Sequence, residues 1–204
     1  MTSMRRHLAY ATMGMALALA GCASPNPDLY TIAPVSGPIS GATTATAQKG
    51  APLVVVLQQI GLARYLERSQ IVRSSENYKL DVSSNDWWGE PLSAMLSRVL
   101  VDELGQRLPQ STVLSESGAV STTPDVTVEL NVLRLDQDAT GNLILAAQAS
   151  ISAKAGDAPA LQSFRFSVRP PTPDVQGQVA AISTAVGQLA DKLAPLILAS
   201  SAVR

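Results

Sequence analysis

Hydrophobic and polar positions alternate along two consecutive stretches of the chain, residues 126–132 and 143–151. Alternation with a period of two is typical of strands that bury one face, and residues 140–142 between them (Thr-Gly-Asn) are turn formers. The pattern therefore predicts a β-hairpin. A third strand is expected over residues 161–168, where Phe164, Phe166 and Val168 share one face.

Shorter strands are expected before this hairpin. The apolar, β-branched run at residues 53–57 predicts a buried strand. Ile71-Val72, residues 78–80 and Val113-Leu114 are briefer strand candidates. Residues 29–32 (Leu-Tyr-Thr-Ile) alternate over a single repeat, so we expect them to add an edge strand to the domain.

Two longer segments repeat apolar residues at the spacing of an amphipathic helix. The first is expected to begin at Pro91, because proline is tolerated in the first turn, and to end at Pro109. The second is expected to follow Asp174, a good N-cap residue, and to be kinked or ended by Pro195. Two long helices on one face of a mainly antiparallel sheet predict an α/β (α+β) two-layer sandwich.

Residues 1–21 have the pattern of a bacterial lipoprotein signal peptide. Arg5 and Arg6 precede an apolar run at residues 8–20, which is shorter than the roughly 20 residues that a spanning helix requires. The run ends in the lipobox Leu-Ala-Gly-Cys, so we expect cleavage before Cys22 and acylation of that cysteine, palmitate included. A non-lipidated secretory peptide with a chance cysteine is the alternative.

Residues 22–52 are expected to hold the lipidated cysteine and a mostly flexible tether. Small and polar residues dominate this segment, which therefore cannot bury enough surface to offset chain entropy. If wholly disordered, about 28 residues would reach roughly 30 Å. Residues 53–204 have the composition and length of a single globular domain. Ala23 stands where an inner-membrane retention signal has Asp, which favours the outer membrane and its periplasmic face.

Processing would leave the mature chain with little catalytic chemistry. His7 is the only histidine and Cys22 the only cysteine, so neither a Ser-His-Asp arrangement nor an imidazole metal site is expected. Removing Arg5 and Arg6 reduces the 15 basic residues to 13 against 16 acidic ones, a charge of −3 that gives no reason to bind nucleic acid. No catalytic residue, metal or cofactor is predicted, and a carboxylate-only or Ser-Lys hydrolase is the remaining enzymatic alternative.

One region carries motifs beyond composition. YLERSQIVR at residues 65–73 is followed by NYKL at 77–80, DWWGEPL at 86–92 and RVLVDEL at 98–104. These motifs resemble the PqiC/YmbA family, the ABC-type transport auxiliary lipoproteins. The resemblance covers most of residues 27–195, and the family motif W-A-E-P is WGEP here.

The resemblance implies an outer-membrane lipoprotein that is a non-catalytic docking subunit of an intermembrane lipid-transport complex. Its expected partners are the membrane, through the N-terminal acyl chains, an MCE (mammalian cell entry) type periplasm-spanning protein, and a permease. A homo-oligomer would suit a protein that meets a multimeric partner. The alternative is a structural or regulatory envelope lipoprotein, either an activator of cell-wall synthesis or an outer-membrane assembly factor.

Six residues in the motif region are candidates for contacting a partner. Tryptophan and arginine are enriched at interface hot spots, but an adjacent Trp pair can also place one ring in the core. Glu90 is expected to accept hydrogen bonds from Arg68 or Arg73, or to favour the helix N-terminus, and an arginine-rich cluster is often only a solvated face. Asp136 and Asp138 are expected to be plain surface residues. The candidates are Arg64, Arg68, Arg73, Trp87, Trp88 and Glu90.

Overall fold

The computed structural model of the chain describes residues 26–37, 52–120, 122–154 and 158–201. The lipobox and Cys22 lie outside these residues, as does most of the expected tether. In the part that is described, neither helix combines the length and the apolar character needed to cross a membrane.

The described residues form strands, one 3-10 helix and two α-helices. In chain order these are β1 (Asp28–Tyr30), β2 (Val54–Leu57), β3 (Gly61–Leu62), η1 (Arg64–Leu66), β4 (Gln70–Ser74), β5 (Asp81–Trp88), α2 (Leu92–Arg107), β6 (Thr112–Ser115), β7 (Val126–Gln137), β8 (Leu143–Ala153), β9 (Ala160–Val168) and α3 (Val175–Ser201).

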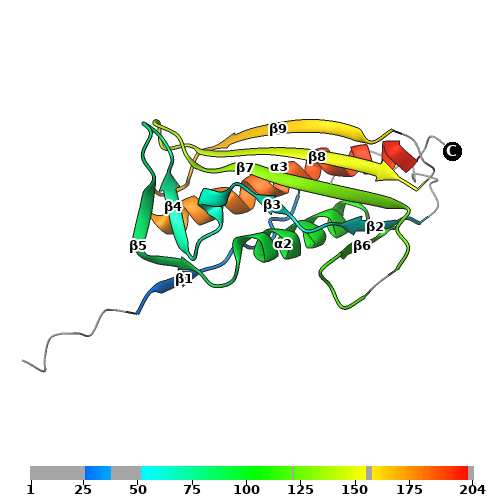
Figure 1. The fold of residues 1–204 in the computed structure, drawn as a ribbon, viewed down its shortest axis with the longest axis horizontal. Helices are drawn as coiled ribbons and strands as arrows, with labels where there is room; N and C mark the ends of the chain where they lie inside the picture. The colour runs from blue at the N-terminus through cyan, green and yellow to red at the C-terminus, as the bar shows by residue number, and fades with distance from the viewer. Residues whose placement is uncertain (1–25, 38–51, 121, 155–157, 202–204) are drawn as a thin grey trace, which may run out of the picture.

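The strands belong to one nine-stranded sheet in the described part of the chain, and both helices pack on one of its faces (Figure 1). The long strands β7, β8 and β9 pair antiparallel, as do β4 and β5. The shorter strands β2 and β3 pair parallel to β7, and β1 pairs parallel to β5 at the edge of the sheet. The predicted α+β sandwich is therefore confirmed.

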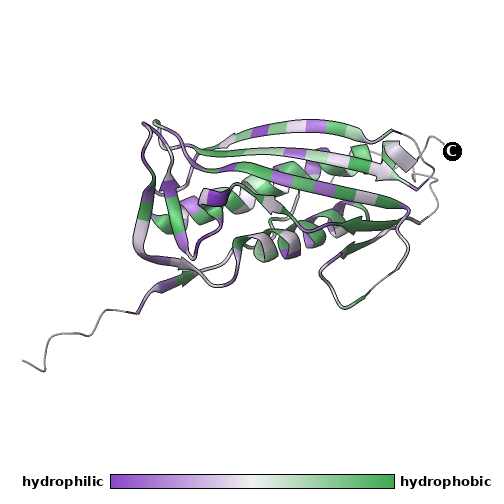
Figure 2. Ribbon diagram, viewed as in Figure 1, coloured by the Kyte–Doolittle hydropathy of each residue, from purple (hydrophilic) through white to green (hydrophobic). Residues whose placement is uncertain are grey.

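Alternation along β7 decides which face of the sheet is buried. Val126, Val128, Leu130 and Val132 are at most 5% exposed and belong to the core. Their neighbours along the strand are more polar, so the ribbons of the long strands change hydropathy from residue to residue (Figure 2). A bulge then interrupts the pairing of β7 with β8 between Val132 and Arg134. Because a bulge adds one residue, the side chains beyond it exchange faces.

The predicted hairpin, the strand over residues 161–168 and both helices are confirmed. Asp174 caps α3 as expected, since its Oδ1 accepts a hydrogen bond from Gly177 N–H at 2.8 Å. A kink or an end was expected at Pro195, and an end is wrong, because Pro195 lies inside α3, which continues to Ser201. The strand expected at residues 78–80 is also wrong, because this segment forms the turn that leads into β5.

Candidate functional site

The two adjacent tryptophans lie on β5 and have different surroundings. Trp88 is 8% exposed and belongs to the hydrophobic core, close to the beginning of α2. Trp87 is only partly buried and pairs with Leu29 of β1, although its indole nitrogen is itself buried and has no partner among the described residues. Of the pair, Trp87 is thus the one placed to contact another molecule.

Glu90 binds neither of the arginines that the sequence suggested. Its Oε1 lies 2.6 Å from Nη2 of Arg98, which lies on α2. The side chains of Glu90 and Arg98 are 38% and 54% exposed. Arg68 donates instead to the Tyr65 carbonyl at 3.0 Å, and Arg73 donates to the Pro173 carbonyl at 2.8 Å. The expected pairing with Arg68 or Arg73 is therefore wrong, and an exposed pair such as Glu90–Arg98 contributes at most about 1 kcal/mol.

The structure brings some of the six candidates together and separates the others. Arg64 and Arg68 are exposed on η1 and the turn that follows it. The backbone N–H of Trp88 donates to the Ser69 carbonyl at 2.7 Å, which places the turn that carries Arg68 beside the end of β5. Arg73, in contrast, is directed at the start of α3.

A buried carboxylate next to this region was not expected from the sequence. The side chain of Asp136 is fully buried. The bulge in β7 places it on the face of the sheet away from the helices, where Tyr65 of η1 contacts it. Its oxygens accept hydrogen bonds from the Tyr65 hydroxyl at 2.7 Å, the Ser75 hydroxyl at 2.9 Å and the Arg134 guanidinium at 2.9 Å. Arg134 also lies 2.6 Å from Glu76. This network, the Asp136 network, fixes η1 and the β4–β5 hairpin to β7.

The same network makes the stability of the protein sensitive to alkali. Burial raises the pKa of the Tyr65 hydroxyl, and the hydrogen bond to Asp136 raises it further. Above about pH 10 the unfolded chain loses this proton while the folded chain keeps it. The unfolded state then binds fewer protons, so the free energy of unfolding falls as the pH rises above about 10 and is unaffected below that value.

Tyr65→Phe removes this contribution. We expect denaturation midpoints of the variant, measured from about pH 8 to pH 11, to fall less steeply above pH 10 than those of the parent chain. A parallel decline in the two proteins would show that Tyr65 does not cause the alkaline loss.

A second buried ionic network holds residues 32–37, here called the N-terminal strap, against the helices. Ile32 is 1% exposed, and Ala33 N–H donates to the Ser183 hydroxyl of α3 at 3.2 Å. Val35 N–H donates to Oε1 of Glu103 at 2.6 Å. The composition of the strap predicted that it belongs to the flexible tether, but it is bound to both helices.

Arg107 connects the partners of the strap. Its guanidinium donates to Glu103, to Asp191 at 2.6 Å and to the Gly187 carbonyl at 3.1 Å. The Glu103 side chain is fully buried and that of Arg107 is 10% exposed. The network of Glu103, Arg107 and Asp191 therefore joins α2, α3 and the strap.

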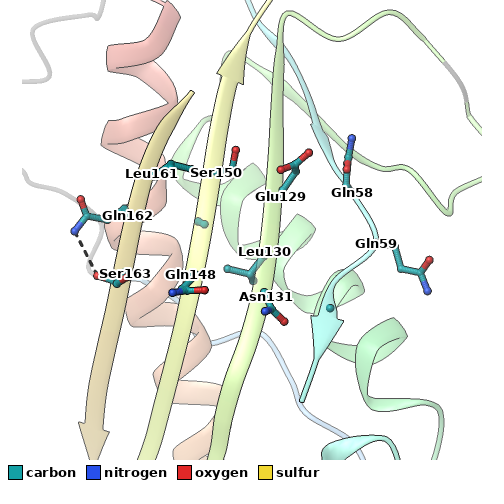
Figure 3. Close-up of a pocket in the computed structure, with 12 residues that line it drawn as sticks. Gln58, Gln59, Glu129, Leu130, Asn131, Gln148, Ser150, Leu161, Gln162 and Ser163 are labelled. Atoms are coloured by element: carbon teal, nitrogen blue, oxygen red, sulfur yellow. Dashed lines mark hydrogen bonds between the residues drawn. The ribbon is translucent and has the colours of Figure 1, made fainter. Parts of the chain in front are cut away.

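The face of the sheet without helices carries a shallow groove of about 540 Å³ (Figure 3). Amide side chains from the loop after β2 and from β7, β8 and β9 surround it, and Glu129 is its only charged lining residue. Among the described residues, no three His, Cys, Asp or Glu side chains gather as a metal site would require. The amides are Gln58, Gln59, Asn131, Gln148 and Gln162.

Comparison with known proteins places this chain among transport lipoproteins. The model of a family described as ABC-type transport auxiliary lipoprotein component matches residues 34–194. The intermembrane transport lipoprotein PqiC of Escherichia coli K12 and that of Shigella flexneri are each 34% identical over 116 residues. These matches cover 55% of this chain and 59% of each curated relative, so they span little more than half of the relatives' length.

Two crystal structures are similar in fold. One, of an uncharacterized protein, has a TM-score of 0.68 at 14% identity and covers 85% of this chain and 99% of its own. The other, of a Xanthomonas campestris protein, has a TM-score of 0.65 at 16% identity and covers 84% and 95% of the two chains. At these identities the similarity shows a shared fold alone.

Proposed function

Because the chain belongs to the ABC-type transport auxiliary lipoprotein family, we propose that it is a lipid-anchored subunit of an intermembrane lipid-transport complex. The family match over residues 34–194 carries this proposal. The subunit is held by acyl chains on Cys22 at the periplasmic face of the outer membrane, and it docks with an MCE-type protein that works with a permease. The chain catalyses no reaction itself, in keeping with a mature sequence without histidine.

Membrane attachment through Cys22 is supported by the lipobox and by the position of the strap. The strap begins ten residues after Cys22, and β1 begins six residues after it, so the folded domain follows the lipidated cysteine closely. In this proposal the signal peptide is residues 1–21 and the lipidated N-terminal segment is residues 22–52. The transport domain is residues 53–204, and β1 and the strap are attached to it.

Cys22→Ser tests the attachment. We expect the variant, exported behind a cleavable signal peptide without a lipobox, to lack acyl chains and to move from the membrane fraction to the soluble periplasmic fraction, because the acyl chains supply the attachment in this proposal. Ala23→Asp is the matched variant that stays acylated, and we expect it to shift from the outer to the inner membrane. Cys22→Ser protein that remains in the membrane fraction would contradict lipid anchoring.

The docking surface in this proposal is the exposed part of the motif region. Arg64 is exposed on η1 and Arg68 on the turn that follows it, while Trp87 on β5 and Glu90 beside the start of α2 are partly exposed. Trp88 and Arg73 are not part of this surface: Trp88 packs in the core, and Arg73 donates to the carbonyl of Pro173.

A pull-down from solubilised envelopes tests the docking role. We expect the acylated chain to recover an MCE-type protein, and the double variant Arg64→Glu, Arg68→Glu to recover less of it. Arg165→Glu reverses the charge of an exposed arginine on β9 and is the control, which should recover as much as the parent chain. Recovery of cell-wall synthases or assembly factors without an MCE-type protein would favour the structural or regulatory alternative.

A further inference from the structure

The turn between β4 and β5 holds an exposed aromatic residue in an unfavourable backbone conformation. Asn77 and Tyr78 have φ of 56° and 59°, so both central residues are left-handed, as in a type I′ turn. Asn and Gly favour this conformation, whereas an aromatic residue is rarely found in it. Tyr78 is fully exposed, so packing within the domain does not compensate for the strain. Such uncompensated strain directs attention to a contact outside the folded chain.

The turn is held in place from below. Ser75 donates to the buried Asp136, and Glu76 is paired with Arg134, so the Asp136 network fixes the two residues that precede the turn. Lys79 N–H donates back to the Glu76 carbonyl at 3.2 Å. Tyr78 therefore projects from a fixed support.

Other exposed apolar side chains lie along the same edge of the sheet. Leu80 follows the turn and is 39% exposed, and Leu29 of β1, which pairs with Trp87 of β5, is 67% exposed. The turn itself carries an aromatic, a cationic and an aliphatic residue in sequence. Tyrosine and lysine side chains are suited to the boundary between lipid and water, because each combines an apolar body with a polar end.

Chain length keeps this edge near the proposed lipid anchor. Five residues separate Cys22 from Asp28, the first residue of β1, so the anchor lies within roughly 20 Å of that strand even if the chain is fully extended. Asp28 pairs with Asp86, which is six residues along β5 from Leu80, a distance of roughly 20 Å. The edge and the β4–β5 turn occupy one end of the molecule (Figure 1). An anchored domain therefore has this end within reach of the bilayer.

We propose that the β4–β5 turn and the β1–β5 edge rest on the lipid surface, with Tyr78 and Leu80 at the headgroup level. This inference rests on the acylation of Cys22 proposed above. Asp28, Asp81 and Asp86 lie on the same two strands, so anionic lipid does not attract this edge. The contact is made by apolar and aromatic groups with lipid that is mainly zwitterionic, and it is insensitive to salt.

Tryptophan placed in the turn reports this contact. Full-length acylated protein carrying Tyr78→Trp is incorporated into phosphatidylethanolamine vesicles whose acyl chains are brominated. Leu161→Trp is the control, because Leu161 is 75% exposed and lies at the start of β9, at the other end of the molecule (Figure 1). Trp87 and Trp88 are present in both proteins. We expect quenching of the added tryptophan to be several-fold greater at position 78, and unchanged when phosphatidylglycerol or salt is added.

A longer connection to the anchor tests the geometry in the same assay. A Gly-Ser insertion of about 20 residues before Asp28 should reduce quenching at position 78 several-fold, because it lets the domain move away from the bilayer. The same insertion within residues 38–51 lies beyond β1 and the strap, and should leave the quenching unchanged.

Two results would overturn the inference in distinguishable ways. Equal quenching at positions 78 and 161 in acylated protein would overturn it while leaving the proposed function intact. In that case, reduced recovery of a protein partner by Tyr78→Ala would assign the turn to that partner. Mass spectrometry that finds no acyl chain on Cys22 would overturn lipid anchoring, and this inference with it.

Discussion

Replacing Arg107 with alanine is expected to lower the free energy of unfolding by about 3–5 kcal/mol. The guanidinium is the cation that neutralises Glu103, whose side chain is fully buried between the helices and the strap. Without it, a buried carboxylate stays unpaired and the Gly187 carbonyl loses a donor. Urea denaturation followed by far-ultraviolet circular dichroism measures the loss, and the strap should become the most readily proteolysed part of the domain.

Two further variants separate the buried charge from the deletion of an arginine. Arg98→Ala removes an arginine from the same helix whose ion pair with Glu90 is exposed, and we expect it to lower the stability by at most about 1 kcal/mol. The double variant Glu103→Leu, Arg107→Leu should be more stable than Arg107→Ala, because neither charge remains buried. A loss of similar size in Arg98→Ala and Arg107→Ala would show that the buried network does not stabilise the fold.

The network of Glu103, Arg107 and Asp191 shows which features of the structure can be predicted from the sequence pattern and which cannot. Periodicity predicted the two helices, which the structure confirms, and Glu103 lies among the buried residues of the first one. The partners of Glu103 could not be predicted, because Val35 precedes it by 68 residues and Asp191 lies 84 residues beyond Arg107. Only the packing of α2, α3 and the strap brings these groups together.

Irregularities in the sheet explain where the structure differs from the strands and surface residues predicted from the sequence. The strand expected at residues 78–80 is a turn, because Asn77 and Tyr78 adopt left-handed φ without the glycine that usually marks such a turn. Strand β5 has few alternating apolar residues, so the sequence pattern did not predict a strand at this position. Asp136 was expected at the surface because it was placed beside the hairpin tip, whereas β7 continues to Gln137 and the side chains of Tyr65, Ser75 and Arg134 cover its carboxylate.

Asp136→Ala is expected to lower the free energy of unfolding by about 2–4 kcal/mol. The buried carboxylate accepts hydrogen bonds from Tyr65, Ser75 and Arg134, so its removal leaves three donors without their acceptor. Asp136→Asn keeps an acceptor of the same shape and removes the charge, so we expect a smaller loss, seen as a higher midpoint in urea. Equal midpoints for the two variants would indicate that the lost charge, which the two variants share, determines the effect, and not the hydrogen-bond acceptor that asparagine retains.

The same two variants connect stability to the lipid contact. Because the Asp136 network fixes Ser75 and Glu76, its loss should loosen the turn that carries Tyr78 before the rest of the sheet unfolds. Amide hydrogen exchange in residues 74–81 should therefore accelerate more in Asp136→Ala than exchange in β8, which pairs with strands on both sides. Uniform acceleration throughout the sheet would show that the network stabilises the domain as a whole and does not specifically support the turn.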